Sequence, residues 1–173
     1  MAARSKTKKR PAAKRSAARK TTTAPDALAL LKADHAKVTA MFQQYDRLTD
    51  RSQAKKLELA RTICNELKVH TRIEEEIFYP AVREALPRED DLLDEAKVEH
   101  DGAKDLIRQI DGMQPADDLF DAKVTVLGEY VKHHVKEEQN EMFPKVRKTK
   151  LDLREIGMRL AFRKEELMQQ LAR

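Results

Sequence analysis

The sequence predicts an all-α protein: an antiparallel up-down-up-down four-helix bundle with an additional C-terminal helix and a disordered basic N-terminal tail. Composition is the first reason, because 173 residues with 38% charged residues, four Gly, six Pro and no Trp are typical of long solvated helices. The second is that apolar residues recur at alternating spacings of three and four, which is the period of one helix face. The third is that only short breaks separate these runs, so consecutive helices pack antiparallel.

The first element is a basic tail. Residues 1–24 hold nine Lys and Arg and no Asp or Glu, whereas the rest of the chain holds the other 26 basic residues (35 minus 9) and all 30 acidic ones. The net charge of +5 is therefore the sum of a tail of +9 and a body of −4. Because the tail has hardly any large apolar residue, it cannot bury enough surface to offset its conformational entropy, and we expect residues 1–25 to be disordered.

The bundle helices follow within residues 26–148, and a fifth helix is expected within 149–173, packed across the bundle or against a partner. Pro25 and Asp26 are typical of a helix start. Turn-like breaks lie at "TDRS" near 49–52, "LPRED" near 86–90 and "GMQPADD" at 112–118. The inward stripes of the five helices are, in chain order, Leu28, Leu31, His35, Val38, Phe42, Tyr45; Leu57, Ala60, Cys64, Leu67, His70, Glu74, Phe78; Leu93, Ala96, His100, Ala103, Ile107, Ile110; Phe120, Val124, Leu127, Val131, His134, Glu138, Met142; and Leu153, Ile156, Leu160, Leu167, Leu171.

The bundle is an internal repeat of helix pairs. "HTRIEEEIFYP" at 70–80 and "HHVKEEQNEMFP" at 133–144 each place a Glu four residues and a Pro ten residues after a His of the stripe. "ADHAKV" in the first helix is likewise answered by "VEHDGAKDL" in the third. Each pair of helices therefore places two histidines and one glutamate on faces that turn toward the core.

The loop positions predict that these ionisable side chains meet at one level of the bundle. Counted from the turn of each pair, the first histidine lies about 15 residues before it and the second about 20 after, so their heights agree to within roughly one to one and a half turns. Burying such groups without partners would cost several kcal/mol each, so we interpret the layer as a metal site. Its predicted ligands are His35, His70, Glu74, His100, His134 and Glu138.

This donor set favours two first-row ions. Four imidazoles and two carboxylates are too many ligands for one tetrahedral zinc. They suit two ions, each bound by histidines and bridged to the other by the glutamates, with a position left for a small molecule. Mixed imidazole and carboxylate donors with an open position favour iron, with manganese as the alternative. The Glu-x-x-His motif of ferritin-like proteins and the His-Glu-x-x-His motif of zincins are both absent.

These motifs together resemble the hemerythrin-like (HHE cation-binding) domain family over about residues 26–147. The resemblance rests on "ADH" at 33–35, "HTRIEEEIFYP", "VEHD" at 98–101 and "HHVKEEQNEMFP". It implies a four-helix bundle around a non-haem di-iron centre, with the same six residues as ligands. Oxygen carriers of the family have a second His one turn after the third-helix ligand, where this chain has Lys104. That difference weakens an oxygen-carrier interpretation.

The expected function is the binding or turnover of a small oxidant, namely oxygen, nitric oxide or peroxide, including a catalase-like turnover of peroxide. Whether the chain is an enzyme stays open, because the same ligands serve binding and catalysis. The alternatives are an iron or oxygen sensor, and a DNA-associated protective protein tethered through residues 1–24 without sequence preference. No apolar run is long enough to span a bilayer, so no membrane partner is expected. The single Cys64 cannot form an intramolecular disulfide, which favours a cytoplasmic location. A tail that binds DNA would make that location nucleoid-associated.

Residues beside the stripes lead to further expectations. His133 is adjacent to His134 and so points about 100° away from it, toward the outer face. Glu75 and Glu137 are candidates for orienting the ligand imidazoles. Tyr45 and Tyr130 lie on or beside inward stripes, and we expect both to pack in the core.

Overall fold

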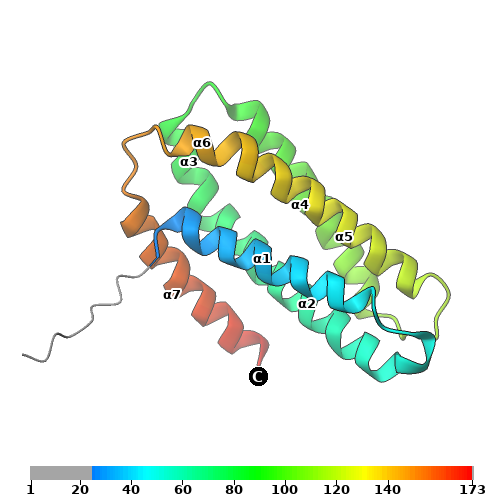
Figure 1. Ribbon diagram of the computed structural model, residues 1–173. Helices are drawn as coiled ribbons and strands as arrows, with labels where there is room; N and C mark the ends of the chain where they lie inside the picture. Colours follow the sequence, from blue (N-terminus) through cyan, green and yellow to red (C-terminus); the bar gives the residue numbers. More distant parts are fainter. Residues whose placement is uncertain (1–24, 173) are drawn as a thin grey trace, which may run out of the picture.

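The computed structural model describes residues 25–172, which form helices and short connections without a strand in that range (Figure 1). The helices are α1 (Ala27–Tyr45), α2 (Gln53–Ile73), α3 (Tyr79–Ala85), α4 (Asp90–Asp111), α5 (Phe120–Glu137), α6 (Phe143–Val146) and α7 (Leu153–Leu171). A 3-10 turn, η1 (Asp50–Ser52), precedes α2. The side chain of Asp26 caps α1 by accepting a hydrogen bond from the backbone N–H of Ala29 at 2.7 Å.

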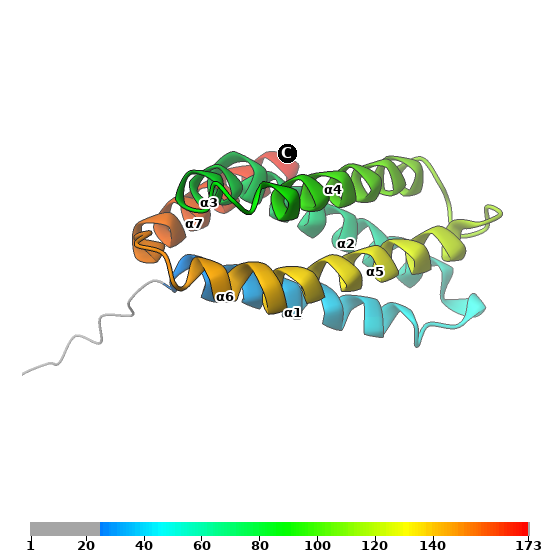
Figure 2. The ribbon, with the colours of Figure 1, turned by 90° about the horizontal axis from the view of Figure 1, so that it is seen from above.

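The predicted bundle is confirmed. One π-helical turn, η2 (Glu74–Phe78), joins α2 to α3, and another, η3 (Glu138–Met142), joins α5 to α6, so the bundle consists of four continuous rods. Helix α1 packs against α2 and α5, and α4 packs against α2 and α5, which gives a closed antiparallel arrangement (Figures 1 and 2). The connections fall at the three predicted breaks.

The two π-helical turns begin at the two glutamates of the repeat. The backbone N–H of Tyr79 bonds to the carbonyl of Glu74, five residues earlier, and the N–H of Phe143 bonds in the same way to Glu138. A proline follows each of these turns and has no N–H to continue the α-helical ladder, which favours a wider turn at this place. The extra residue in each turn brings Tyr79 and Phe143 into the core.

Two apolar clusters fill the bundle, one on each side of the layer of ionisable side chains. One contains Phe78, Phe143 and the buried face of α7. The other contains Cys64, Leu67 and Phe120 and lies toward the opposite end of the rods. Burial raises the pKa of the Cys64 thiol to about 12, as expected of a structural cysteine.

Helix α7 packs across α1 and α2, which decides between the two placements expected for it (Figure 1). Its buried face includes Ile156, Leu160 and Leu167, whereas Leu171, at the last turn of the helix, is 44% exposed. Gly157 permits a close approach to the start of α1, because a Cβ atom there would lie only 2.6 Å from the carbonyl oxygen of Pro25.

Two remaining expectations concern disorder of the basic tail and helices that could cross a membrane. The predicted disorder of the basic tail lies outside the described residues. Within the part that the structure describes, no helix has both the length and the apolarity needed to cross a membrane.

Candidate metal centre

All six residues predicted as metal ligands are buried, and the fold brings them into one layer. The four histidines come from α1, α2, α4 and α5, one from each rod of the bundle. The two glutamates stand where the π-helical turns begin. Exposed fractions are 0% for Glu74, 1% for Glu138 and at most 7% for the histidines.

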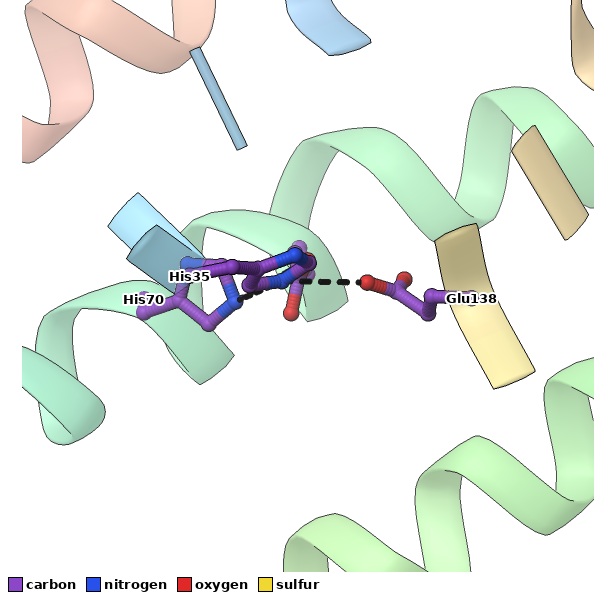
Figure 3. Close-up of side chains that lie close together, drawn as sticks. His35, His70 and Glu138 are labelled. Carbon is purple, nitrogen blue, oxygen red and sulfur yellow. Dashed lines mark hydrogen bonds and ion pairs between the residues drawn. The ribbon is translucent and has the colours of Figure 1, made fainter. Parts of the chain in front are cut away.

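The Nε2 atoms of the histidines face inward in two pairs. The Nε2 atoms of His35 and His70 lie 3.0 Å apart, and those of His100 and His134 lie 3.2 Å apart. Figure 3 shows the first pair with Glu138, whose Oε2 lies 3.3 Å from Nε2 of His35.

Each glutamate contacts both histidine pairs. Glu74 places Oε1 3.3 Å from Nε2 of His70 and Oε2 3.4 Å from Nε2 of His100. Oε2 of Glu138 lies 3.3 Å from Nε2 of His35 and 3.8 Å from Nε2 of His134. The two histidine pairs, each a set of possible metal donors that we call a donor pocket, therefore share both glutamate carboxylates.

A polar partner lies near the outer nitrogen of every histidine. Glu75 lies 3.1 Å from Nδ1 of His100, and Glu99 lies 2.7 Å from Nδ1 of His134. Since a carboxylate only accepts, these two nitrogens carry the proton and each Nε2 presents its lone pair inward, as a metal ligand does. The two histidines of the first half have different neighbours: Oδ2 of Asp34 lies 3.7 Å from Nδ1 of His70, beyond hydrogen-bond distance, and the amide nitrogen of Gln139 lies 3.0 Å from Nδ1 of His35.

Two lysines hold these outer carboxylates. Lys164 of α7 donates to Asp34, and Lys104 of α4 donates to Glu75 at 2.6 Å. Lys104 stands where oxygen carriers of the resembled family have a fifth histidine. Here its ammonium group bonds to the carboxylate that supports His100.

Burial and neighbouring charges both shift the pKa values of the layer. It lowers the pKa of His70 to about 4, so that imidazole is neutral at pH 7. Burial and the charge of Glu138 raise the pKa of Glu74 well above its ordinary value. For Glu138, burial is outweighed by His35 and His134, which lower its pKa below the ordinary value. Because two buried carboxylates repel each other, their pKa values move apart, with that of Glu74 raised and that of Glu138 lowered.

Tyr79 is a site residue that the sequence pattern did not identify. Its hydroxyl donates to Oε1 of Glu138 at 3.1 Å and lies 3.4 Å and 3.5 Å from Nε2 of His100 and His134. Burial and the nearby glutamates raise its pKa well above the ordinary value, so the phenol is neutral. Phe143 takes the equivalent place in the first half and stacks parallel to His35 with ring centroids 6.0 Å apart. The two halves of the centre therefore differ: a tyrosine hydroxyl lies beside His100 and His134, and a phenylalanine ring lies beside His35.

A small apolar pocket borders the histidines on the side away from Tyr79. Val38, Leu67, Ala103 and Val131 line it together with the four imidazoles. Its free volume of about 20 Å³ has room for a molecule of roughly the size of water. Tyr130 stands at its rim and is 48% exposed, so the expectation of core packing is wrong for this residue, because its ring lies across Gly102 at the surface.

Of the two predicted orienting residues, only Glu75 contacts a histidine that was predicted as a ligand. Glu137 instead lies 3.1 Å from Nε2 of His133, which is on the outer face as predicted and 61% exposed. The carboxylates directly before His35 and His100, Asp34 and Glu99, instead lie beside Nδ1 of His70 and His134, where Glu137 was expected to lie. The repeated dipeptides "DH" at 34–35 and "EH" at 99–100 were the available signal.

The donor set fits metal cations. Among the described residues, no donor hydrogen-bonds either carboxylate oxygen of Glu74, or Oε2 of Glu138, although all three oxygens are buried. The inward Nε2 atoms also face one another in pairs, 3.0 Å and 3.2 Å apart. A cation at each histidine pair would satisfy both the oxygens and the nitrogens. One group of donors, His35, His70, Glu74 and Glu138, and a second, Glu74, His100 and His134, each gather within 4.8 Å.

An antiparallel helical bundle with histidines and glutamates buried at its centre defines a metal-binding helical domain. The chain belongs to the hemerythrin HHE cation-binding domain family, whose pattern matches residues 26–146. The family binds metal cations, typically iron.

Two known proteins resemble the chain. The crystal structure of a hemerythrin HHE cation-binding domain-containing protein from Mycobacterium kansasii superposes with a TM-score of 0.71 over 84% of this chain and 89% of that one, at 23% identity. At this identity the likeness supports the fold alone. A DNA nickase from Nostoc sp. is 29% identical over 118 residues, which are 68% of this chain. The match spans only 32% of the nickase.

Proposed function

We propose that the chain is a non-haem di-iron protein that binds or reacts with a small oxidant. His35 and His70 would hold one ion, His100 and His134 the other, and Glu74 and Glu138 would contact both. Manganese is the alternative metal, because it accepts the same imidazole and carboxylate donors. The proposal is supported by the two donor pockets that share both glutamates.

The choice of a small oxidant as the substrate rests on the small apolar pocket beside the four imidazoles. Its small size suits a molecule of a few atoms, such as oxygen, nitric oxide or peroxide, and its apolar walls limit the entry of bulk water. A ferrous pair bound at the centre would supply electrons and an open position for such a molecule. The outer carboxylates hold the imidazoles in place, and Tyr79 holds a proton at its hydroxyl next to Glu138.

Visible spectroscopy of the iron-loaded protein after separate additions of oxygen, nitric oxide and peroxide tests this proposal. We expect at least one of them to change the spectrum of the wild type and none to change that of His100→Ala. If the chemistry is turnover of peroxide, the wild type releases oxygen catalytically. Reversible binding of oxygen without any reaction with peroxide would favour carriage or sensing. An unchanged spectrum with all three molecules would refute the proposal.

A second candidate function is association with DNA. It is favoured by the similarity to a DNA nickase and by the nine positive charges of residues 1–24. Such a tail can neutralise phosphates and release their counterions, and without aromatic residues it should show no sequence preference. The activity of the nickase itself is not carried over, because the match spans 32% of that protein.

Gel-shift titrations of the full chain and of residues 25–173 test the DNA association. If about five phosphates are contacted, log affinity falls with log salt at a slope of about −4 to −5. Truncation should abolish binding and leave the metal spectrum unchanged. Equal affinity of the two proteins at low salt would contradict a tether.

A further inference from the structure

A third cluster of metal-binding donors lies at the surface beside the buried layer. Nε2 of His133 on α5 is 3.1 Å from Oε1 of Glu137, one turn later, and 3.4 Å from Oε1 of Glu99 on α4. One donor atom from each residue lies within 4.8 Å of the other two. Exposed side-chain fractions of 61% for His133, 30% for Glu137 and 19% for Glu99 leave the cluster open to solvent on one side.

Glu99 links this surface cluster to the buried layer. Its Oε1 faces His133, whereas its Oε2 is 2.7 Å from Nδ1 of the ligand His134. A small cavity continues inward from Glu99 and Glu137 to His134 and Glu138, between the apolar side chains Leu92, Ala96 and Met142. Its free volume of about 10 Å³ is close to that needed by a single water molecule. At its inner end is Glu138, 1% exposed, with an oxygen that no described donor hydrogen-bonds.

The internal repeat shows that the surface cluster of Glu99, His133 and Glu137 occurs in the second half only. In the described first half, the equivalents of Glu99, His133 and Glu137 are Asp34, Val69 and Ile73. Val69 and Ile73 are buried in the same apolar cluster as Ile156, Leu160 and Leu167 of α7. Lys164 of α7 neutralises Asp34. Helix α7 thus closes the first half with apolar residues and a positive charge, while the second half presents an imidazole and two carboxylates to solvent.

We propose that Glu99, His133 and Glu137 form an outer loading site, which captures a divalent first-row cation from solvent and passes it to the buried centre. One imidazole with two carboxylates suits ferrous, manganese or zinc ions. Two carboxylates and one imidazole carry a formal charge of −2 or −1, so the cluster attracts cations. The delivery step rests on the proposed function, because it requires that the buried histidines and glutamates hold metal.

The geometry assigns different parts to the three residues. His133 is the most exposed and meets the ion first, with Glu137 positioned one helical turn away to bind beside it. Glu99 contacts both the outer and the inner histidine, so it is the point of transfer. The ion exchanges water for protein ligands along the cavity, and no bond other than those to the metal is made or broken.

Binding of Mn²⁺ to the metal-loaded protein tests the outer site directly, because the buried centre is then full. Loss of the electron paramagnetic resonance signal of free Mn²⁺ measures the binding. We expect one further Mn²⁺ to bind to the wild type and none to bind to His133→Ala or Glu137→Gln. Glu129→Gln, which removes an exposed charge one turn before His133 on the same helix, is the control and should retain the ion. Absence of a further Mn²⁺ in the wild type, or equal binding by all four proteins, would overturn the site.

Loading kinetics test the delivery step. Ferrous iron is added without oxygen to metal-free full-length protein, and bound iron is measured at intervals after removal of free iron with a chelator. Relative to the wild type and Glu129→Gln, His133→Ala should load about tenfold more slowly or worse, yet reach the same final iron content. Equal loading rates would refute delivery. If purified wild type does not hold two ions, the proposed function fails instead, and the difference in bound Mn²⁺ between the wild type and His133→Ala still decides the outer site.

Discussion

Replacing Glu74 with methionine should stabilise the metal-free protein and destabilise the metal-loaded one. Glu74 is fully buried, and neither of its carboxylate oxygens receives a hydrogen bond from the described residues. A buried polar group without a partner costs about 1–3 kcal/mol. Methionine removes that group at a similar volume, so the free energy of unfolding of the metal-free protein should rise by about that amount. For a chain of this length, the melting temperature should rise by roughly 2 to 12 °C.

The order of stability should reverse when metal is present. A cation that binds only the folded wild type stabilises it by about 4 kcal/mol at a thousandfold excess over its dissociation constant, and the variant has lost a shared ligand. Melting curves followed by circular dichroism, with chelator and with iron, provide the comparison. Glu58→Met, an exposed change on the same rod of the bundle, is the control and should alter stability by no more than about 0.5 kcal/mol. A metal-free Glu74→Met protein that melts below the wild type would refute this reasoning.

The pH dependence of this effect has a definite sign. Burial and Glu138 raise the folded-state pKa of Glu74 above its ordinary value of 4.5. Glu74 therefore lowers the free energy of unfolding least below pH 4.5. Its cost grows as the pH rises from 4.5 through the folded-state pKa, because the buried group then has to ionise. The advantage of Glu74→Met in the metal-free protein should consequently be larger at pH 7 than at pH 4. An advantage that grows on acidification would contradict the assigned protonation.

Three further predictions concern α7, the outer carboxylates and proton release. Gly157→Ala should lower the free energy of unfolding by about 1–3 kcal/mol, because its Cβ would lie 2.6 Å from a carbonyl oxygen at the start of α1. Gly112→Ala, whose Cβ would meet nothing closer than 3.6 Å, is the control, and equal losses in denaturant melts would contradict the docking of α7. Asp34→Asn should weaken iron binding about 10- to 100-fold in chelator competition, whereas the exposed change Asp105→Asn should not. Because burial raises the pKa of Glu74 and a bound metal favours the ionised carboxylate, iron binding should release protons and weaken as the pH falls. Calorimetric titrations in buffers of different ionisation enthalpy measure that release, and an uptake of protons would reverse the assignment.

The sequence predicted the bundle and its ionisable layer because both depend on helical periodicity and short loops. It did not predict Tyr79, since a constant period of 3.6 residues places Phe78 on the stripe and does not anticipate a π-helical turn. The prolines after both turns are the sequence feature that could have indicated the change. The contact of Lys164 with Asp34 was also beyond reach, because periodicity identifies the apolar face of α7 and not its angle across the bundle.

Anomalous diffraction at the iron edge, from crystals of the purified protein, tests the central claim most directly. We expect two iron peaks in each chain, one beside the Nε2 atoms of His35 and His70 and one beside those of His100 and His134. Both should lie within reach of Glu74 and Glu138. A single peak, or zinc in place of iron at these positions, would contradict a di-iron centre.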